Sequence, residues 1–366
     1  MISSNIQSLL DSAIIPIQFF ISHAPKLTFM DLKRRHLMKQ LNSKALSIPL
    51  KSVSLAIILL LTVIMAGSAL AENPKSKDPI ILTLHDWTGQ YLTTHMMGRV
   101  LEEMGYNIKY VQADYIAQFA GLESGDLHIA MEMWETTGKQ AMEASLETGK
   151  TVDLGETGMK AIEEWWYPAY MKEKCPGLPD WKALNDCAKA FSTPETYPKG
   201  RYLGGPVTWS GFDDERAEAL ELDYEVVHAG TDAALFAELK SAYERKAPWL
   251  GWIYTPHWAP IKFKGEWVEF PRYTEECYHD PSWGTNKRLA YDCGKPRGWI
   301  KKVGWKDGEK KWPCAYQAVR NFKVDNNTIG NMIGEVDLDG RPVDDVVEEW
   351  LKNNKSTWMK WTECSN

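Results

Sequence analysis

Several patterns that identify common enzymes and metal proteins are missing from this sequence. It has no G-x-S-x-G, H-E-x-x-H or G-x-x-x-x-G-K-[ST] motif, so esterase, zinc-protease and P-loop sites find no support. It also lacks a C-x-x-C or H-x-x-x-H pair, the spacings typical of zinc ligands. We therefore predict no catalytic residue, no bound metal and no cofactor.

Positive charge is scarce after residue 71. Seven of the 42 Lys and Arg, but only two of the 49 Asp and Glu, lie in residues 1–71, so residues 72–366 carry a formal net charge of −12. A protein that binds a polyanion usually presents excess positive charge. The composition therefore disfavours nucleic acid as a partner.

Long apolar runs are also few. Residues 53–66 form a run of 14 residues without an acidic side chain, preceded by a basic stretch and followed by the small residues that end at Ala71. This order is typical of a secretory signal, and the run is shorter than the roughly 20 residues that span a bilayer. We predict cleavage after Ala71 and a periplasmic protein, with a retained membrane anchor as the alternative. Met30 or Met38 would be a more natural start than Met1.

All six cysteines lie beyond the predicted cleavage site. An even number of cysteines in an exported protein favours disulfides, although six cysteines allow fifteen connectivities. Pairing of near neighbours predicts Cys175–Cys187 and Cys277–Cys293, which leaves Cys314–Cys364.

The chain after residue 78 alternates short apolar runs with segments of helical spacing. Such alternation predicts an α/β fold with a parallel, doubly wound sheet. The expected strands are 80–84, 108–111 and 127–133, with helices over 91–104 and 115–123 between them.

A second region of the same kind follows. We expect strands over 166–171 and 249–254, a helix over 231–245 with Thr231 as its N-cap, and an amphipathic helix over 341–352. Residues 272–315 are irregular and rich in Gly, Pro, Cys and Trp, which indicates an insertion pinned by disulfides.

Tryptophan is unusually abundant, with 17 residues in the chain. Trp87, Trp134, Trp166 and Tyr254 fall at or just past the ends of predicted strands, and Trp209 is a fifth candidate. In open α/β sheets, ligands bind beyond the carboxyl ends of the strands. Core packing is the alternative for each of these residues.

Aromatic faces that converge on one point suit a soft cation. A trimethylammonium group cannot donate strong hydrogen bonds, but each aromatic face attracts it by about 0.5–2 kcal/mol. Asp86, Glu132 and Glu135 flank the candidate tryptophans and could add attraction for a cation, or could simply be solvated acids at strand ends. An acid in the cleft would repel the carboxylate of glycine betaine and favour choline or trimethylamine N-oxide.

These residues resemble the glycine betaine/choline-binding family of ABC transporter substrate-binding proteins. The resemblance covers roughly residues 78–270 and, more loosely, the C-terminal helix. Two features depart from it: Tyr254 stands where other members have Trp, and residues 272–315 have no counterpart. The matching stretches are Asp86-Trp87-Thr88, Glu132-Met133-Trp134, Trp166-Tyr167-Pro168 and Tyr254-Thr255-Pro256-His257-Trp258.

The resemblance implies a two-lobed periplasmic binding protein of type II, whose hinged α/β lobes with parallel-rich sheets and flanking helices close on the ligand. Residues 78–162 and 259–366 would form the first lobe, and 163–258 the second. Trp87 and Trp134 would be walls from the first lobe, Trp166 and Tyr254 further walls, and Trp209 a cap. It further implies a small methylated-amine ligand (choline, trimethylamine N-oxide or glycine betaine), a cognate ABC permease in the inner membrane, no catalysis and a monomer.

Two other readings remain open. A secreted carbohydrate-active enzyme could stack sugars on tryptophan and pair Glu132 with Glu163 or Glu164. Residues 337–340 faintly resemble part of a calcium loop, but we interpret them as a turn.

Overall fold

The computed structural model describes residues 76–364, which all belong to one compact unit, Ala71–Asn366. The predicted leader, with its apolar run and its cleavage site after Ala71, lies outside the described residues. Within the described range, no helix is both long enough and apolar enough to cross a membrane.

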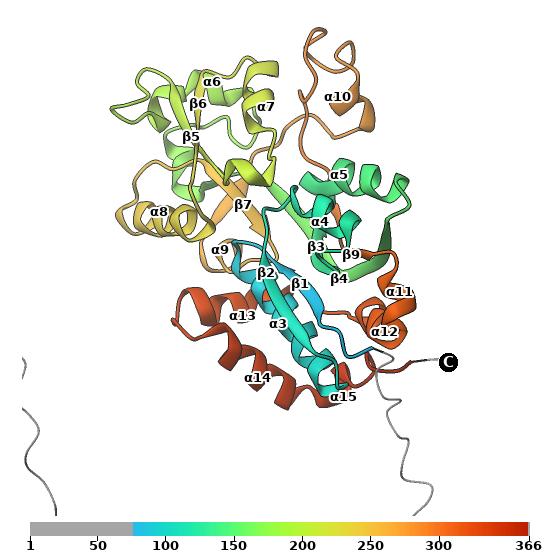
Figure 1. Ribbon diagram of the computed structural model, residues 1–366. Coiled ribbons are helices and arrows are strands. Elements are labelled where there is room, and N and C mark those ends of the chain that lie inside the picture. The colour runs from blue at the N-terminus through green and yellow to red at the C-terminus, as the bar shows by residue number, and fades with distance from the viewer. Residues whose placement is uncertain (1–75, 365–366) are drawn as a thin grey trace, which may run out of the picture. The chain divides into compact units, whose positions relative to one another are not determined.

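The described strands form one mixed sheet with the order β2-β1-β3-β9-β4-β7-β5-β6, and β8 pairs with β4 away from this path (Figure 1). Strands β1, β2 and β3 are parallel neighbours, as are β5, β6 and β7, whereas β9 and β4 run antiparallel to their partners. The result is two parallel groups that antiparallel strands join.

We call the part built on β1–β3 and β9 the first lobe. Helices α13 and α14 pack on α3 there. Its elements are β1 (Ile80–Leu84), α3 (Thr88–Glu103), β2 (Ile108–Gln112), α4 (Gln118–Ser124), β3 (Ile129–Trp134), α5 (Glu135–Glu147), β9 (Gly298–Trp305), α11 (Gly308–Lys311), α12 (Pro313–Asn321), α13 (Asn326–Asp337), α14 (Val343–Asn353) and α15 (Lys355–Trp358).

The part built on β5–β8 is the second lobe. Thr231 caps α8 as predicted, because its side chain accepts the Ala234 N–H at 3.1 Å. Its elements are η1 (Ala169–Glu173), α6 (Ala183–Asp186), η2 (Ala188–Phe191), β5 (Gly200–Gly204), η3 (Val207–Trp209), α7 (Asp213–Ala219), β6 (Tyr224–His228), α8 (Asp232–Arg245), β7 (Gly251–Thr255), α9 (Ala259–Lys262), β8 (Gly265–Trp267) and α10 (Glu275–His279).

The long strand β4 (Thr151–Pro168) joins the lobes. Its residues up to Ala161 pair with β9, and those from Ile162 onward pair with β7 and β8. Gly155 and Gly158 adopt positive φ within it, and the register with β9 shifts around them. A strand at 166–171 was expected, but the strand begins 15 residues earlier and gives way to η1 after Pro168.

The chain returns to the first lobe later than the predicted residue 259. Strand β8 still pairs with the second-lobe end of β4. The segment closed by Cys277–Cys293 packs on the start of α7, where Phe212 stacks on Tyr291 at 4.7 Å. The return comes only with β9 at Gly298, and β9 belongs to the sheet, so the irregular segment is shorter than the predicted 272–315.

All three predicted disulfides, Cys175–Cys187, Cys277–Cys293 and Cys314–Cys364, are present. They close loops of very different length, with sequence separations of 12, 16 and 50. In the chain-entropy account, a longer loop restricts the unfolded chain more.

We expect Cys314→Ser with Cys364→Ser to lower the free energy of unfolding by about 4 kcal/mol, against about 3 kcal/mol for Cys175→Ser with Cys187→Ser. Urea unfolding of the two double variants and the parent protein measures both losses. An equal or smaller loss for the longer loop would contradict this account.

Candidate functional site

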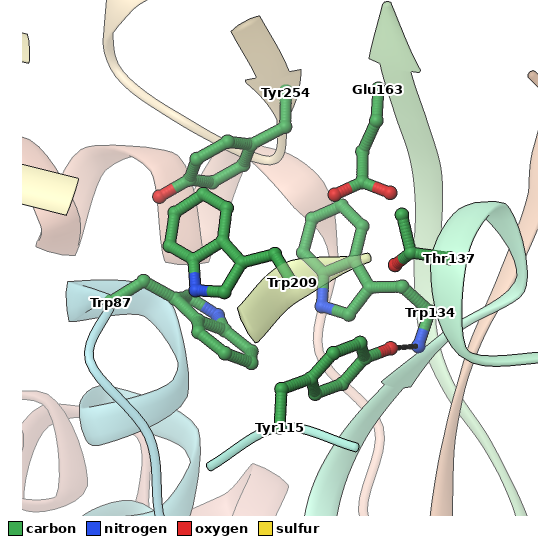
Figure 2. Close-up of a pocket in the computed structure, with 7 residues that line it drawn as sticks. All are labelled: Trp87, Tyr115, Trp134, Thr137, Glu163, Trp209 and Tyr254. Carbon is green, nitrogen blue, oxygen red and sulfur yellow. Dashed lines mark hydrogen bonds between the residues drawn. The ribbon is translucent and has the colours of Figure 1, made fainter. Parts of the chain in front are cut away.

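A cavity lies where the two lobes meet (Figure 2). The first lobe contributes residues from the β1–α3 junction, the segment before α4 and the β3–α5 junction, and the second lobe contributes residues from β4, η3 and β7. The lining is mostly aromatic and has no Lys or Arg. It consists of Trp87, Tyr115, Trp134, Thr137, Glu163, Trp209 and Tyr254.

The aromatic walls meet edge to face across the lobe boundary. Trp87 and Trp209 have ring centroids 5.7 Å apart at 76°, and Trp134 and Tyr254 have centroids 5.5 Å apart at 86°. The space between the rings has a volume of about 20 Å³. That volume is enough for a water molecule.

Glu132 fixes two of these walls from behind. Its carboxylate accepts the indole N–H of Trp87 at 2.9 Å and of Trp134 at 3.1 Å, and it also accepts the Thr93 hydroxyl at 2.8 Å. Burial raises the pKa of Glu132, and these three donors oppose that rise. The predicted acid is therefore at the site, but it positions the rings and does not line the cavity.

Asp86 also positions an aromatic ring, but across the lobe boundary. Its carboxylate in the first lobe accepts the indole N–H of Trp209 in the second lobe at 2.8 Å. Trp209 in turn meets Trp87 and Tyr254 edge to face. The predicted cap residue is thus held over the cavity by a predicted acid.

Two predicted site residues lie elsewhere, which corrects the prediction. Trp166 is buried in the second lobe, where its ring contacts Trp249 with centroids 6.1 Å apart and closely approaches Gly265. On β4 its paired residues belong to β7 and β8, and its side chain is 1% exposed, as expected of core packing. Glu135 accepts the backbone N–H of Trp299 at 3.1 Å and does not line the cavity.

Glu163 is the functional candidate that sequence reasoning missed as a binding residue. It reaches the cavity from β4 and accepts the Thr136 hydroxyl. Burial raises its pKa to about 8, although the nearby charge of Lys295 acts in the opposite direction. At neutral pH, Glu163 is therefore a neutral carboxylic acid that can donate a hydrogen bond.

Tyr115 and Thr137 were also missed. The Tyr115 hydroxyl accepts the backbone N–H of Trp134 at 2.9 Å, and its ring stands edge to face against Trp87 (Figure 2). Both residues sit one turn or less from predicted element ends, the only signal that the sequence offered for them.

Comparison with known proteins finds one family over most of the chain. Residues 78–353 match the family described as the substrate binding domain of ABC-type glycine betaine transport system. A trimethylamine N-oxide-binding protein of Pelagibacter ubique (strain HTCC1062) is 34% identical over 323 residues, which cover 86% of this chain and 99% of that protein.

Solved structures share the fold at lower identity. Lactococcal OpuAC, closed and complexed with glycine betaine, has a TM-score of 0.60 at 15% identity, with 78% of this chain and 100% of that chain covered. An ABC-transporter choline binding protein in complex with choline has a TM-score of 0.63 at 17% identity, with 79% and 93% covered.

Replacing Glu132 with Gln tests its role behind the rings. The amide retains the volume but presents an N–H₂ group where two indole N–H groups and a hydroxyl need acceptors. We expect the free energy of unfolding to fall by about 1–3 kcal/mol. Exposed Glu143→Gln on α5 is the matched control, with an expected change within about 0.5 kcal/mol. Chemical denaturation measures both, and equal stability of the two variants would refute the role.

Proposed function

The chain belongs to the family of substrate-binding domains of ABC-type glycine betaine transport systems, and on that premise we propose that it captures trimethylamine N-oxide. The single observation that carries this choice is the pairing, in one cavity, of aromatic walls with the buried carboxyl group of Glu163, whose pKa burial raises to about 8. The aromatic walls suit the trimethylammonium part of the ligand, and the carboxyl group suits its oxygen.

The aromatic walls supply attraction for the methylated nitrogen. Trp87, Trp134, Trp209 and Tyr254 offer faces or edges from both lobes, and all four are buried. Each face contributes about 0.5–2 kcal/mol, more where water is excluded. Because two walls come from each lobe, the ligand is enclosed only when the lobes are together.

Glu163 discriminates among the three candidate ligands. The oxygen of trimethylamine N-oxide carries formal negative charge next to the nitrogen, so it is a strong acceptor for a protonated carboxyl group. Glycine betaine would bring a carboxylate into a lining that has no Lys or Arg to pair with it. The nearby Lys295 is occupied, since its ammonium group lies 3.2 Å from Asp213 and over the Trp252 ring. Choline is larger and offers only a hydroxyl.

The comparison with known proteins also favours trimethylamine N-oxide as the ligand. The relative with 34% identity is named for trimethylamine N-oxide, and its length is almost fully covered. An inner-membrane ABC permease, a periplasmic location and a monomeric state without nucleic acid accompany this proposal as expectations.

A carbohydrate-active enzyme is the weaker alternative. Its supposed acid pair is already engaged: Glu132 holds two indole N–H groups, and Glu164 forms a buried ion pair with Arg216 at 2.8 Å. Neither lines the cavity, so no second carboxyl group faces Glu163 there.

Calorimetry with the three amines tests the proposal directly. We expect trimethylamine N-oxide to bind more tightly than choline or glycine betaine. Trp134→Ala should weaken its binding at least about tenfold, because a desolvated cation–π contact and ring packing are lost. Trp358→Ala in the C-terminal α15 is the control and should bind normally. Unchanged affinity in Trp134→Ala, or tighter binding of glycine betaine, would refute the assignment.

The pKa of Glu163, about 8, predicts a pH effect. Its neutral form dominates below that pH and is lost as the pH rises through it, so the hydrogen-bond donor to the ligand oxygen disappears. We expect affinity for trimethylamine N-oxide to fall between pH 7.5 and 9. Glu163→Gln keeps a neutral donor, so its affinity should decline less than that of the parent over this range. A wild-type decline that Glu163→Gln reproduces in full would exclude Glu163 as its source.

A further inference from the structure

A second cluster of polar side chains lies directly behind the cavity wall at Tyr254. Asp232, at the start of α8, and His257, after β7, belong to the second lobe, whereas Asp337, at the end of α13, belongs to the first. Their potential ligand atoms all lie within 4.8 Å of one another. The cluster is therefore a place where the lobes meet, separate from the cavity itself.

Asp232 connects a cavity wall to the opposite lobe. Its carboxyl group accepts the Tyr254 hydroxyl at 2.9 Å. The backbone N–H of Thr88, in the first turn of α3, also favours its charged form. Helix α3 has Trp87 as its N-cap and no side-chain cap of its own. Asp232 thus places a carboxyl group from the second lobe at an uncapped helix start in the first.

Asp337 makes the reciprocal connection. It accepts the Thr88 hydroxyl of its own lobe at 2.7 Å and the indole N–H of Trp258 in the second lobe at 2.8 Å. Each lobe therefore contributes one aspartate that accepts a hydrogen bond from the other lobe.

His257 does not supply a cation or a metal ligand here. Its Nδ1 accepts the backbone N–H of Ala259 at 3.1 Å, so in the neutral ring the proton is on Nε2. Nε2 lies 3.7 Å from the Asp337 carboxylate, and the ring is fully buried against Phe236. A protonated Nε2 has no lone pair for a metal, so the spacing of the three side chains alone does not make a metal site. Burial also lowers the pKa of His257 and keeps the ring neutral.

The charged side chains that act most strongly on Asp232 are carboxylates. Asp337 faces it from α13 and Asp86 from the β1–α3 junction, while Tyr254, His257 and the Thr88 amide are neutral donors. Neither Lys nor Arg is among the groups that shift its pKa most. Asp232 is buried whereas Asp337 is more exposed, so a negative charge on Asp232 beside that of Asp337 is the costly one.

We propose that Asp232 and Asp337 form a latch between the lobes. When the lobes close over the ligand, the Asp232 carboxyl group takes up one proton. The latch also positions Tyr254 as a cavity wall. This inference rests on the proposed function to the extent that ligand drives the closure.

The pKa values of the two aspartates shift in opposite directions. Burial and the nearby charge of Asp337 raise the pKa of Asp232 well above its ordinary value. Burial also works against the charge of Asp337, but donors from His257, Thr88 and Trp258 together lower its pKa. Asp232 therefore holds the proton and Asp337 stays ionised. In separated lobes Asp232 would face water and ionise near its ordinary pKa.

Proton uptake makes closure of the lobes depend on pH. Because closure raises the pKa of an acid, closure binds a proton and becomes less favourable as the pH rises from above the ordinary pKa toward the raised one. Ligand affinity should fall over that range by up to about tenfold per pH unit.

The test uses the full mature protein with Glu163→Gln, which removes the separate titration of the cavity. Calorimetry with trimethylamine N-oxide in buffers of different ionisation enthalpy measures the protons taken up, and Kd is measured from pH 6 to 8. We expect uptake approaching one proton and a Kd that rises with pH. Adding Asp232→Asn should abolish both effects and retain binding, because the amide oxygen still accepts the Tyr254 hydroxyl. Asp232→Ala should weaken binding at every pH, and exposed Asp345→Asn should change nothing.

Binding without proton uptake and with a flat Kd would overturn the latch and leave the proposed function standing. If no methylated amine binds, the proposed function fails and unfolding without ligand decides on the latch. The free energy of unfolding of the parent should then fall, relative to Asp232→Asn, as the pH rises from 5 to 8. Parallel pH dependence of the two proteins would overturn the latch.

Discussion

The contact of aromatic rings from two lobes around one small space is the constraint on which the rest of this structure depends. Trp87 and Trp134 belong to the first lobe, and Trp209 and Tyr254 to the second, yet their rings meet edge to face. Such a space attracts a soft cation only while the lobes are together, because each lobe alone leaves its rings open to water. In the proposed function, recognition and closure are therefore one physical event.

Three acids maintain that arrangement without lining the cavity. Glu132 fixes Trp87 and Trp134, Asp86 holds Trp209, and Asp232 holds Tyr254. Each acid accepts an N–H or O–H at the polar edge of an aromatic ring, which turns the apolar face toward the cavity. These acids thus orient the rings, while burial raises the pKa of one further acid, Glu163, which lines the cavity.

Much of this could be predicted from the sequence, and the failures have physical reasons. Short buried strands such as β1 and β3 and the capped helix α8 were predicted because local pattern dictates them. The long strand β4 was misplaced because Gly155 and Gly158 interrupt its alternation while pairing with β9 and β7 maintains it. Trp87, Trp134, Trp209 and Tyr254 were singled out from their places at element ends, and all four line the cavity. Trp166 was not distinguished from them because the side of a strand that faces a cavity depends on tertiary packing, as the burial of Trp166 against Trp249 shows. Glu163 gave no local signal, since only burial among distant residues makes it a neutral donor.

The most direct test of this account is a crystal structure of the protein grown with trimethylamine N-oxide. The account predicts the ligand nitrogen within about 6 Å of the ring centroids of Trp87, Trp134, Trp209 and Tyr254, with the oxygen on the carboxyl group of Glu163. A ligand bound outside these rings, or one whose oxygen turns away from Glu163, would contradict it.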